Sequence, residues 1–68
     1  MTGQKFKQLR KLAGYNQTEV SCIAGVSIGT ITRFEKHNAN ITMRKLDRMK
    51  KAIGYVEITL KNETNETN

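Results

Sequence analysis

The chain is 68 residues long, close to the lower limit at which one hydrophobic core stabilises a domain without disulfides or bound metal. One cysteine and one histidine exclude an internal disulfide, and we expect neither a metal site nor a cofactor. No apolar run approaches the roughly 20 residues that span a bilayer, so no membrane association is expected. The net charge is +6, and eleven of the twelve Lys and Arg residues fall in residues 1–54 with only three of the six acidic ones. Such a charge favours a polyanionic partner such as nucleic acid, although a solvated lysine-rich surface would have the same composition.

The first predicted helix runs from residue 2 to about residue 13. Its apolar residues recur at intervals of three and four, which predicts one buried stripe made of Phe6, Leu9, Leu12 and Ala13. Thr2 can cap the start of this helix with its hydroxyl, and Gly14 is typical of a helix end. Arg10 lies next to the stripe.

Two short helices are predicted next, over residues 17–24 and 28–36, separated by a three-residue turn. Asn16 is a suitable cap for the first of them because Glu19, three residues later, can complete a capping box. Ser27 is a suitable cap for the second, and Gly25 can take a left-handed conformation at little cost. The residues expected to face inward are Val20, Ala24, Val26, Ile31 and Phe34.

A fourth helix is predicted over residues 43–53, after a polar turn at residues 37–40 in which asparagines tolerate left-handed conformations. Thr42 can cap this helix and Gly54 can end it. Its buried stripe is expected to consist of Leu46, Met49, Ala52 and Ile53. The fold class that follows is all-α, with four helices in one domain over residues 1–54.

After residue 54 the apolar pattern changes from a helical period to a period of two. Over residues 55–61, alternate apolar residues would share one face of a strand. No second strand pattern exists in the sequence, and a lone strand leaves its backbone groups unpaired, so we expect the partner strand to come from a second copy. The alternative is a frayed or helical end. Residues 62–68 form a polar repeat and are expected to be a disordered tail. The expected dimer interface is made of Tyr55, Val56, Ile58 and Leu60.

Several short motifs are spread over residues 6–54: Leu9-Arg10, Asn16-Gln17, Val20, Ala24-Gly25-Val26-Ser27, Ile31, Arg33-Phe34-Glu35, Leu46 and Ala52-Ile53-Gly54. In their joint spacing they resemble the Cro and lambda-repressor-like helix-turn-helix regulators, the XRE family. The resemblance implies a lambda-repressor-like DNA-binding domain that acts as a homodimer on a near-palindromic operator in double-stranded DNA. The expected function is sequence-specific transcription regulation, with this chain expected to act as a repressor, in the cytoplasm of a bacterial or phage-infected cell.

The resemblance also implies roles for individual residues. In this family the N-terminal part of the third helix enters the major groove, and the matching base-facing residues are Ile28, Gly29, Thr32 and Arg33. Arg33 is the one long donor among them and can hold a guanine through its O6 and N7 atoms. An ion pair between Arg10 and Glu35 is implied as a brace for the third helix, with two solvated charges as the alternative. The residues that match phosphate-contacting positions are Asn16, Gln17, Lys36, Asn38, Thr42 and Arg44.

Three residues near these motifs leave open questions. Ile23 occupies a position that is commonly polar in the family, so it is expected either to be exposed or to meet a partner. His37 stands where glycine is common, so Asn38 is expected to take the left-handed conformation instead. Cys22 is interpreted as a half-buried structural thiol, with a redox switch as the alternative.

A second function comes from a different class. The same fold can serve as a protein-interaction module, such as an antitoxin or an antirepressor, with Ile23 and the 55–61 strand as the surface for a protein partner. An enzyme is not expected, because the sequence offers no paired carboxylates, no nucleophile beside a base and no phosphate-binding loop.

Overall fold

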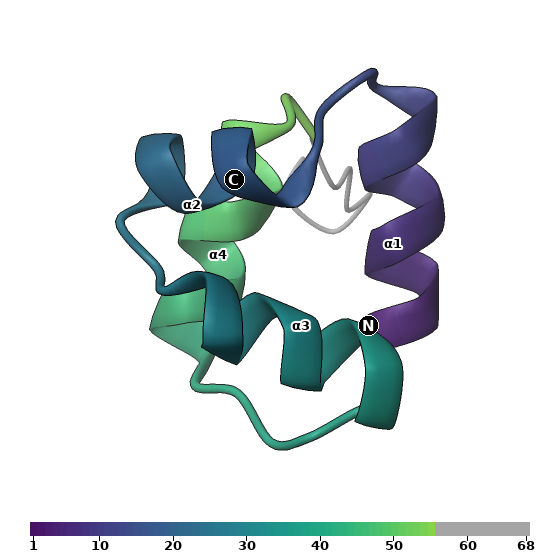
Figure 1. Cartoon of the computed structure of the whole chain (residues 1–68), viewed down its shortest axis with the longest axis vertical. Coiled ribbons are helices and arrows are strands. Elements are labelled where there is room, and N and C mark those ends of the chain that lie inside the picture. Colours follow the sequence, from purple (N-terminus) through teal and green to yellow (C-terminus); the bar gives the residue numbers. More distant parts are fainter. Residues whose placement is uncertain (56–68) are drawn as a thin grey trace, which may run out of the picture.

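The computed structural model describes residues 1–55, which form four α-helices joined by short connections (Figure 1). The helices are α1 (Gly3–Leu12), α2 (Gln17–Ala24), α3 (Ile28–His37) and α4 (Met43–Ala52), and residues 1–55 contain no strand. Both α1 and α2 pack against α3, and α4 packs against α2. The four predicted helices are confirmed, and their ends differ from the predicted ones by at most one residue.

Each helix begins at a side chain that accepts a hydrogen bond from an amide of the first turn. The accepting oxygens lie 2.7–3.2 Å from those amide nitrogens and belong to Thr2, Asn16, Ser27 and Thr42. At α2 the capping box is complete, because Glu19 Oε1 also accepts from the Asn16 N–H at 2.8 Å. Since caps of this kind are each worth about 1 kcal/mol, they explain why such short helices start where the sequence places them.

Left-handed residues end α2 and α3. Gly25 follows α2 with a φ of 68°, and Asn38 follows α3 with a φ of 51°. Asn38 is the single residue other than glycine with a positive φ among residues 1–55. Asparagine accepts this conformation more readily than most residues. His37 stands where glycine was expected, and Asn38, one residue later, takes the left-handed conformation in its place.

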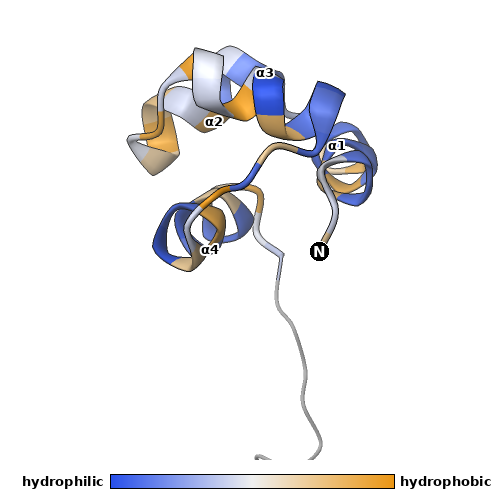
Figure 2. Cartoon of the chain, turned by 90° about the horizontal axis from the view of Figure 1, so that it is seen from below, coloured by the Kyte–Doolittle hydropathy of each residue, from blue (hydrophilic) through white to orange (hydrophobic). Residues whose placement is uncertain are grey.

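The hydrophobic core lies between the four helices, whose ribbons carry both hydrophobic and hydrophilic stretches (Figure 2). The five residues predicted to face inward from the second and third helices are all buried, which confirms that prediction. From α4 and its end, Met49, Ala52 and Ile53 are buried, while Leu46 packs at the edge of the core. The Phe6 and Phe34 rings, 6.4 Å apart between centroids, join α1 to α3.

The predicted stripe of α1 is wrong at its C-terminal end. Leu12 is 84% exposed, and Ala13 is exposed as the residue that caps the helix. At 3.6 residues per turn Leu12 lies about 120° around the helix from Phe6, so it cannot share the face that contacts α3. The buried face of α1 instead runs through Gly3, Phe6 and Arg10.

The predicted interpretation of Cys22 is also wrong in one respect, because this side chain is exposed. Val20 and Ala24, four residues apart, point from α2 into the core, and Cys22 lies midway between them on the opposite side of the helix.

Several predictions concern residues outside those that the structure describes. They are the strand beyond Tyr55, with its residues Val56, Ile58 and Leu60, and the tail over 62–68. Tyr55 itself is partly buried against the core, and its N–H donates to the Lys50 carbonyl at 2.9 Å. The Lys50 ammonium lies 5.8 Å from the centre of the Tyr55 ring. Among residues 1–55 no helix has the length and apolar character needed to cross a membrane.

Candidate nucleic-acid interface

The outer face of α3 is open to solvent while its inner face is part of the core. Ile31, Phe34 and Glu35 are buried, whereas Ile28 is 43% exposed and the other outward positions, Gly29, Arg33 and Lys36, are exposed as well. Thr32 lies at the boundary and is partly buried. The sequence-predicted base-facing residues therefore share one accessible helix surface. An α-helix of this size fits the major groove of B-DNA.

Arg33 folds back along α3 over Gly29. A β-carbon built on Gly29 would lie 3.5 Å from Arg33 Nη1, which is ordinary van der Waals contact. The guanidinium thus lies near the N-terminal part of the helix, beside the backbone of Gly29. This places the five donors of the arginine at the end of α3 that has the exposed Ile28 side chain.

A buried ion pair holds α3 against α1. Arg10 Nε donates to Glu35 Oε2 at 2.8 Å and Arg10 Nη2 donates to Glu35 Oε1 at 2.9 Å, with the two side chains 7% and 3% exposed. A third donor, Arg10 Nη1, reaches the Tyr15 carbonyl at 2.9 Å in the connection before α2. The resemblance implied this pair, and the structure shows it as a two-pronged contact, the strong form of an arginine–carboxylate interaction.

The ion pair continues toward the outer face through two polar side chains. Gln17 Nε2, in the first turn of α2, donates to Glu35 Oε1 at 3.0 Å. Thr32 Oγ1 in turn donates to Gln17 Oε1 at 3.1 Å. These residues form one hydrogen-bonded network, which we call the brace and define as Arg10, Glu35, Gln17 and Thr32. The brace joins α1, α2 and α3 at one place.

A family model described as Helix-turn-helix matches residues 6–60 of the chain. The chain belongs to the Cro and lambda-repressor-like helix-turn-helix family. Searches of curated proteins and of solved structures returned no match. This family consists of DNA-binding transcription regulators and is typically non-enzymatic. The match therefore supports a function of the DNA-binding transcription regulator kind.

Within this helix-turn-helix protein, the expected phosphate-contacting residues divide into two groups. Lys36 and Arg44 are exposed cationic side chains, available to an anion. The side-chain oxygens of the other four accept hydrogen bonds inside the protein. Asn16 and Thr42 cap their own helices, Gln17 belongs to the brace, and Asn38 Oδ1 accepts from the Gly3 N–H at 2.9 Å. A phosphate can only accept hydrogen bonds, so these oxygens are not the atoms that could contact it, and the Gln17 Nε2 that could donate to it is already bonded to Glu35.

Sequence reasoning missed Gly3. This residue is buried in the first turn of α1, and a β-carbon there would collide with the Phe34 carbonyl of α3. Its N–H is the donor to Asn38, so the start of α1 and the end of α3 are tied together. The one available signal was a glycine in a helix first turn, where it is a poor helix former without an evident local reason.

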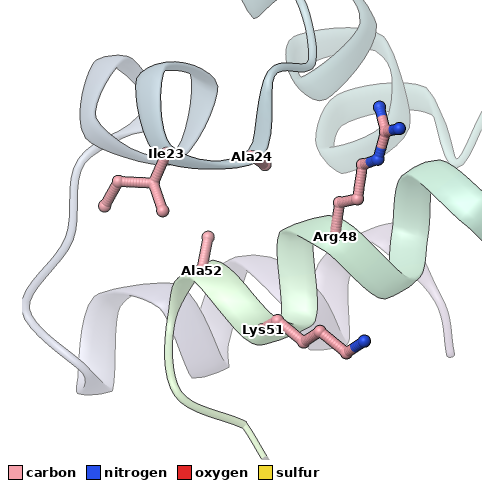
Figure 3. Close-up of a pocket in the computed structure, with 5 residues that line it drawn as sticks. All are labelled: Ile23, Ala24, Arg48, Lys51 and Ala52. Atoms are coloured by element: carbon pink, nitrogen blue, oxygen red, sulfur yellow. The ribbon is translucent and has the colours of Figure 1, made fainter.

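A second surface feature of this helix-turn-helix protein lies away from α3. Ile23 of α2 is 59% exposed and borders an open groove of about 310 Å³ between α2 and α4. In Figure 3 the Ile23 and Ala52 side chains lie on opposite sides of the groove, and the Lys51 side chain runs away from both of them. The Lys51 ammonium lies 3.9 Å from Asp47 Oδ2. The groove is lined by three apolar residues, Ile23, Ala24 and Ala52, and by the side chains of Arg48 and Lys51.

Proposed function

We propose that this chain is a dimeric, sequence-specific transcription repressor that reads the major groove with the outer face of α3. The observation that carries the proposal is the accessible surface of Ile28, Gly29 and Arg33 on a helix whose opposite side is fixed by a buried ion pair. Base discrimination needs donors held in a defined position, and Arg33 is the long donor on that surface. Contact of Arg33 with guanine O6 and N7 is worth roughly 1–3 kcal/mol of discrimination.

Affinity is proposed to come mainly from phosphate contacts. Lys36 and Arg44 supply exposed positive charge, and the N-terminal amides of α2 and α4 add donors that favour an anion. Eleven of the twelve basic residues lie in residues 1–54, which supports a strong sequence-independent attraction to DNA. Binding is therefore expected to weaken steeply as the salt concentration rises.

Dimerisation is proposed to occur through residues 55–61, paired antiparallel with the same segment of a second copy. Support comes from the alternation of Val56, Ile58 and Leu60 in the sequence and from the position of Tyr55, which packs against the core just after α4. A two-fold axis would set two α3 helices about 34 Å apart, one turn of DNA, on a near-palindromic site. Repression then requires no further surface, because a dimer that occupies a promoter excludes polymerase.

The deciding experiment is selection of bound DNA from a random pool at physiological salt, followed by footprinting on the selected site. The proposal expects one symmetric site, with binding lost in Arg33→Ala and retained in Lys11→Ala, a matched removal of charge on the far side of α1 from the core. Binding without sequence preference, or preference that survives Arg33→Ala, would refute it. A reporter gene with the selected site in its promoter then distinguishes repression from activation.

The exposed Ile23 groove supports a second candidate, a protein-interaction module of the antitoxin or antirepressor type. An apolar side chain that is 59% exposed, beside Arg48 and Lys51, suits a partner segment with apolar and acidic residues. Co-expression with the protein encoded beside it tests this role. Ile23→Asp should abolish co-purification and leave DNA selection unchanged, whereas co-purification that survives Ile23→Asp assigns the partner to another surface.

A further inference from the structure

The Thr32 hydroxyl is the point at which the brace reaches the outer face of α3. A threonine hydroxyl has one proton to donate and lone pairs that accept. In this structure the proton is directed inward, to Gln17 Oε1 at 3.1 Å. Thr32 is partly buried, so part of the residue remains open to solvent on this face of α3.

The direction of that hydrogen bond is dictated by the rest of the brace. The Glu35 carboxylate, held by two donors of Arg10, can only accept, so the Gln17 amide must turn its NH₂ group toward it. The Gln17 oxygen is then left facing α3. Because an amide oxygen can only accept, the Thr32 hydroxyl must donate. If the Thr32 hydroxyl were to accept from Gln17 instead, the Gln17 amide would have to turn over and place its oxygen against the Glu35 carboxylate, about where its nitrogen now lies, 3.0 Å away.

We propose that Gln17 is a positioning residue that makes Thr32 an acceptor-only reader of DNA. This inference rests on the proposed function, in which α3 enters the major groove. With its proton committed, Thr32 can accept from the amino group of adenine or cytosine and can contact the thymine methyl group. Guanine presents only the acceptors O6 and N7 in the major groove, so Thr32 disfavours guanine at the base that it meets.

Arg33, the neighbour of Thr32, has the opposite character, because a guanidinium has five donors and no acceptor. Adjacent residues of α3 thus prefer opposite hydrogen-bonding groups on the bases. Arg33 prefers a base with acceptors, and Thr32 prefers a base with a donor or a methyl group. The specificity of the helix is then set partly by a residue of α2 that does not itself touch a base.

The base under Thr32 is identified first, as the position of the selected DNA site at which the base preference changes in Thr32→Val. The test then compares the adenine-to-guanine preference at that position between the wild type and its variants. Gln17→Leu removes the inward acceptor and frees the hydroxyl proton, so this preference should fall roughly 3- to 10-fold, the value of one neutral hydrogen bond. Gln8→Leu, the same change on the exposed side of α1, should leave it unaltered. Loss of a phosphate contact in Gln17→Leu would weaken all sites equally and cancel in the ratio.

Two threonine variants test the inference without touching Gln17, in case Gln17→Leu does not fold. Thr32→Ser keeps the hydroxyl and the inward bond and should retain the discrimination against guanine, whereas Thr32→Val should lose it. Relative to the wild-type spectrum, the NMR resonances of the Gln17 side-chain NH₂ group should shift in Thr32→Val and stay in place in Gln8→Leu.

The outcomes separate this inference from the proposed function. A wild-type protein that selects no DNA motif overturns both. Selection that depends on Arg33, with an adenine-to-guanine ratio in folded Gln17→Leu within twofold of the wild type, overturns the role of Gln17 and leaves the proposed function standing. Equal ratios in Thr32→Ser and Thr32→Val would have the same meaning.

Discussion

Replacement of Arg10 by alanine is the most informative single perturbation of this fold. Arg10 and Glu35 are both buried, and Arg10 supplies two of the three hydrogen bonds that reach the Glu35 carboxylate. In Arg10→Ala a buried carboxylate would keep only the Gln17 amide as a partner, and the Tyr15 carbonyl would lose its donor. Removing one member of a buried pair typically costs about 3–5 kcal/mol.

That loss is large relative to the total stability of so small a domain, which is about 0.05–0.15 kcal/mol per residue. Arg10→Ala is therefore expected to be mostly unfolded at 37 °C. Urea unfolding followed by circular dichroism gives the free energy, and thermal unfolding should show a midpoint lower by more than about 10 °C. Lys11→Ala, which removes an exposed charge from the neighbouring position, should stay within about 0.5 kcal/mol of the wild type.

The double variant Arg10→Met with Glu35→Leu separates two contributions to the free energy of unfolding. One is the net stabilisation by the ion pair, and the other is the cost of leaving the Glu35 carboxylate buried without Arg10. Apolar replacements of a buried pair are often neutral or stabilising, so this variant should recover most of the stability lost in Arg10→Ala. Equal losses in Arg10→Ala and Lys11→Ala would refute the reasoning, because they would mean that Glu35 is adequately solvated without its partner. A double variant no more stable than Arg10→Ala would show that the hydrogen bonds of Arg10 to Glu35 and to the Tyr15 carbonyl stabilise the fold in a way that apolar packing does not replace.

Three further predictions concern the contacts around α1 and α3, and urea unfolding checks each of them. Gly3→Ala should cost about 1–3 kcal/mol because the added methyl group collides with a backbone carbonyl of α3, while Gln4→Ala beside it should change little. Asn38→Ala should cost more than Asn38→Gly, because glycine keeps the left-handed conformation and loses only the bond to the Gly3 amide; equal losses would assign the whole effect to that bond. Leu12→Gln should be nearly neutral, whereas Met49→Ala should cost about 2–5 kcal/mol, and a comparable loss at both would restore the predicted α1 stripe.

The helices and their caps could be predicted from the sequence because the signals are local. Asn16 with Glu19 and Gly25 lie within one or two turns of the structure that they determine, and the structure agrees with them. Leu12 was misplaced because a spacing of three fits a helical stripe while the actual face of α1 is chosen by its contact with α3. Gly3 was missed for the same reason, since the α3 carbonyl that it approaches is more than 30 residues away in the chain.

In the candidate site, too, contacts between residues far apart in the chain could not be predicted from local sequence patterns. Arg10 and Glu35 were proposed as a pair only through a family resemblance, because 25 residues separate them and no local pattern joins them. The resemblance assigned Gln17 to phosphate and Thr32 to bases, and it gave no indication that the two are bonded to each other. Such a bond depends on the angle between α2 and α3, which composition and periodicity do not specify.

The contacts of α3 divide this helix along its length. Its C-terminal half is tied to α1 through Glu35, through the backbone at Phe34 that abuts Gly3, and through Asn38. Thr32 adds a tie to α2 at the middle of the helix. The first turn of α3, by contrast, has the exposed Ile28 and Gly29 over the Ser27 cap. A reading surface needs side chains held within about 0.5 Å of their working position by neighbours that do not themselves read. With the exception of Thr32, which both ties α3 to α2 and is proposed to contact a base, this arrangement meets that requirement. The other residues that fix α3 lie on its inner face and C-terminal end, while Ile28, Gly29 and Arg33 lie on its outer face, where substitution need not disturb the contacts that hold the helix.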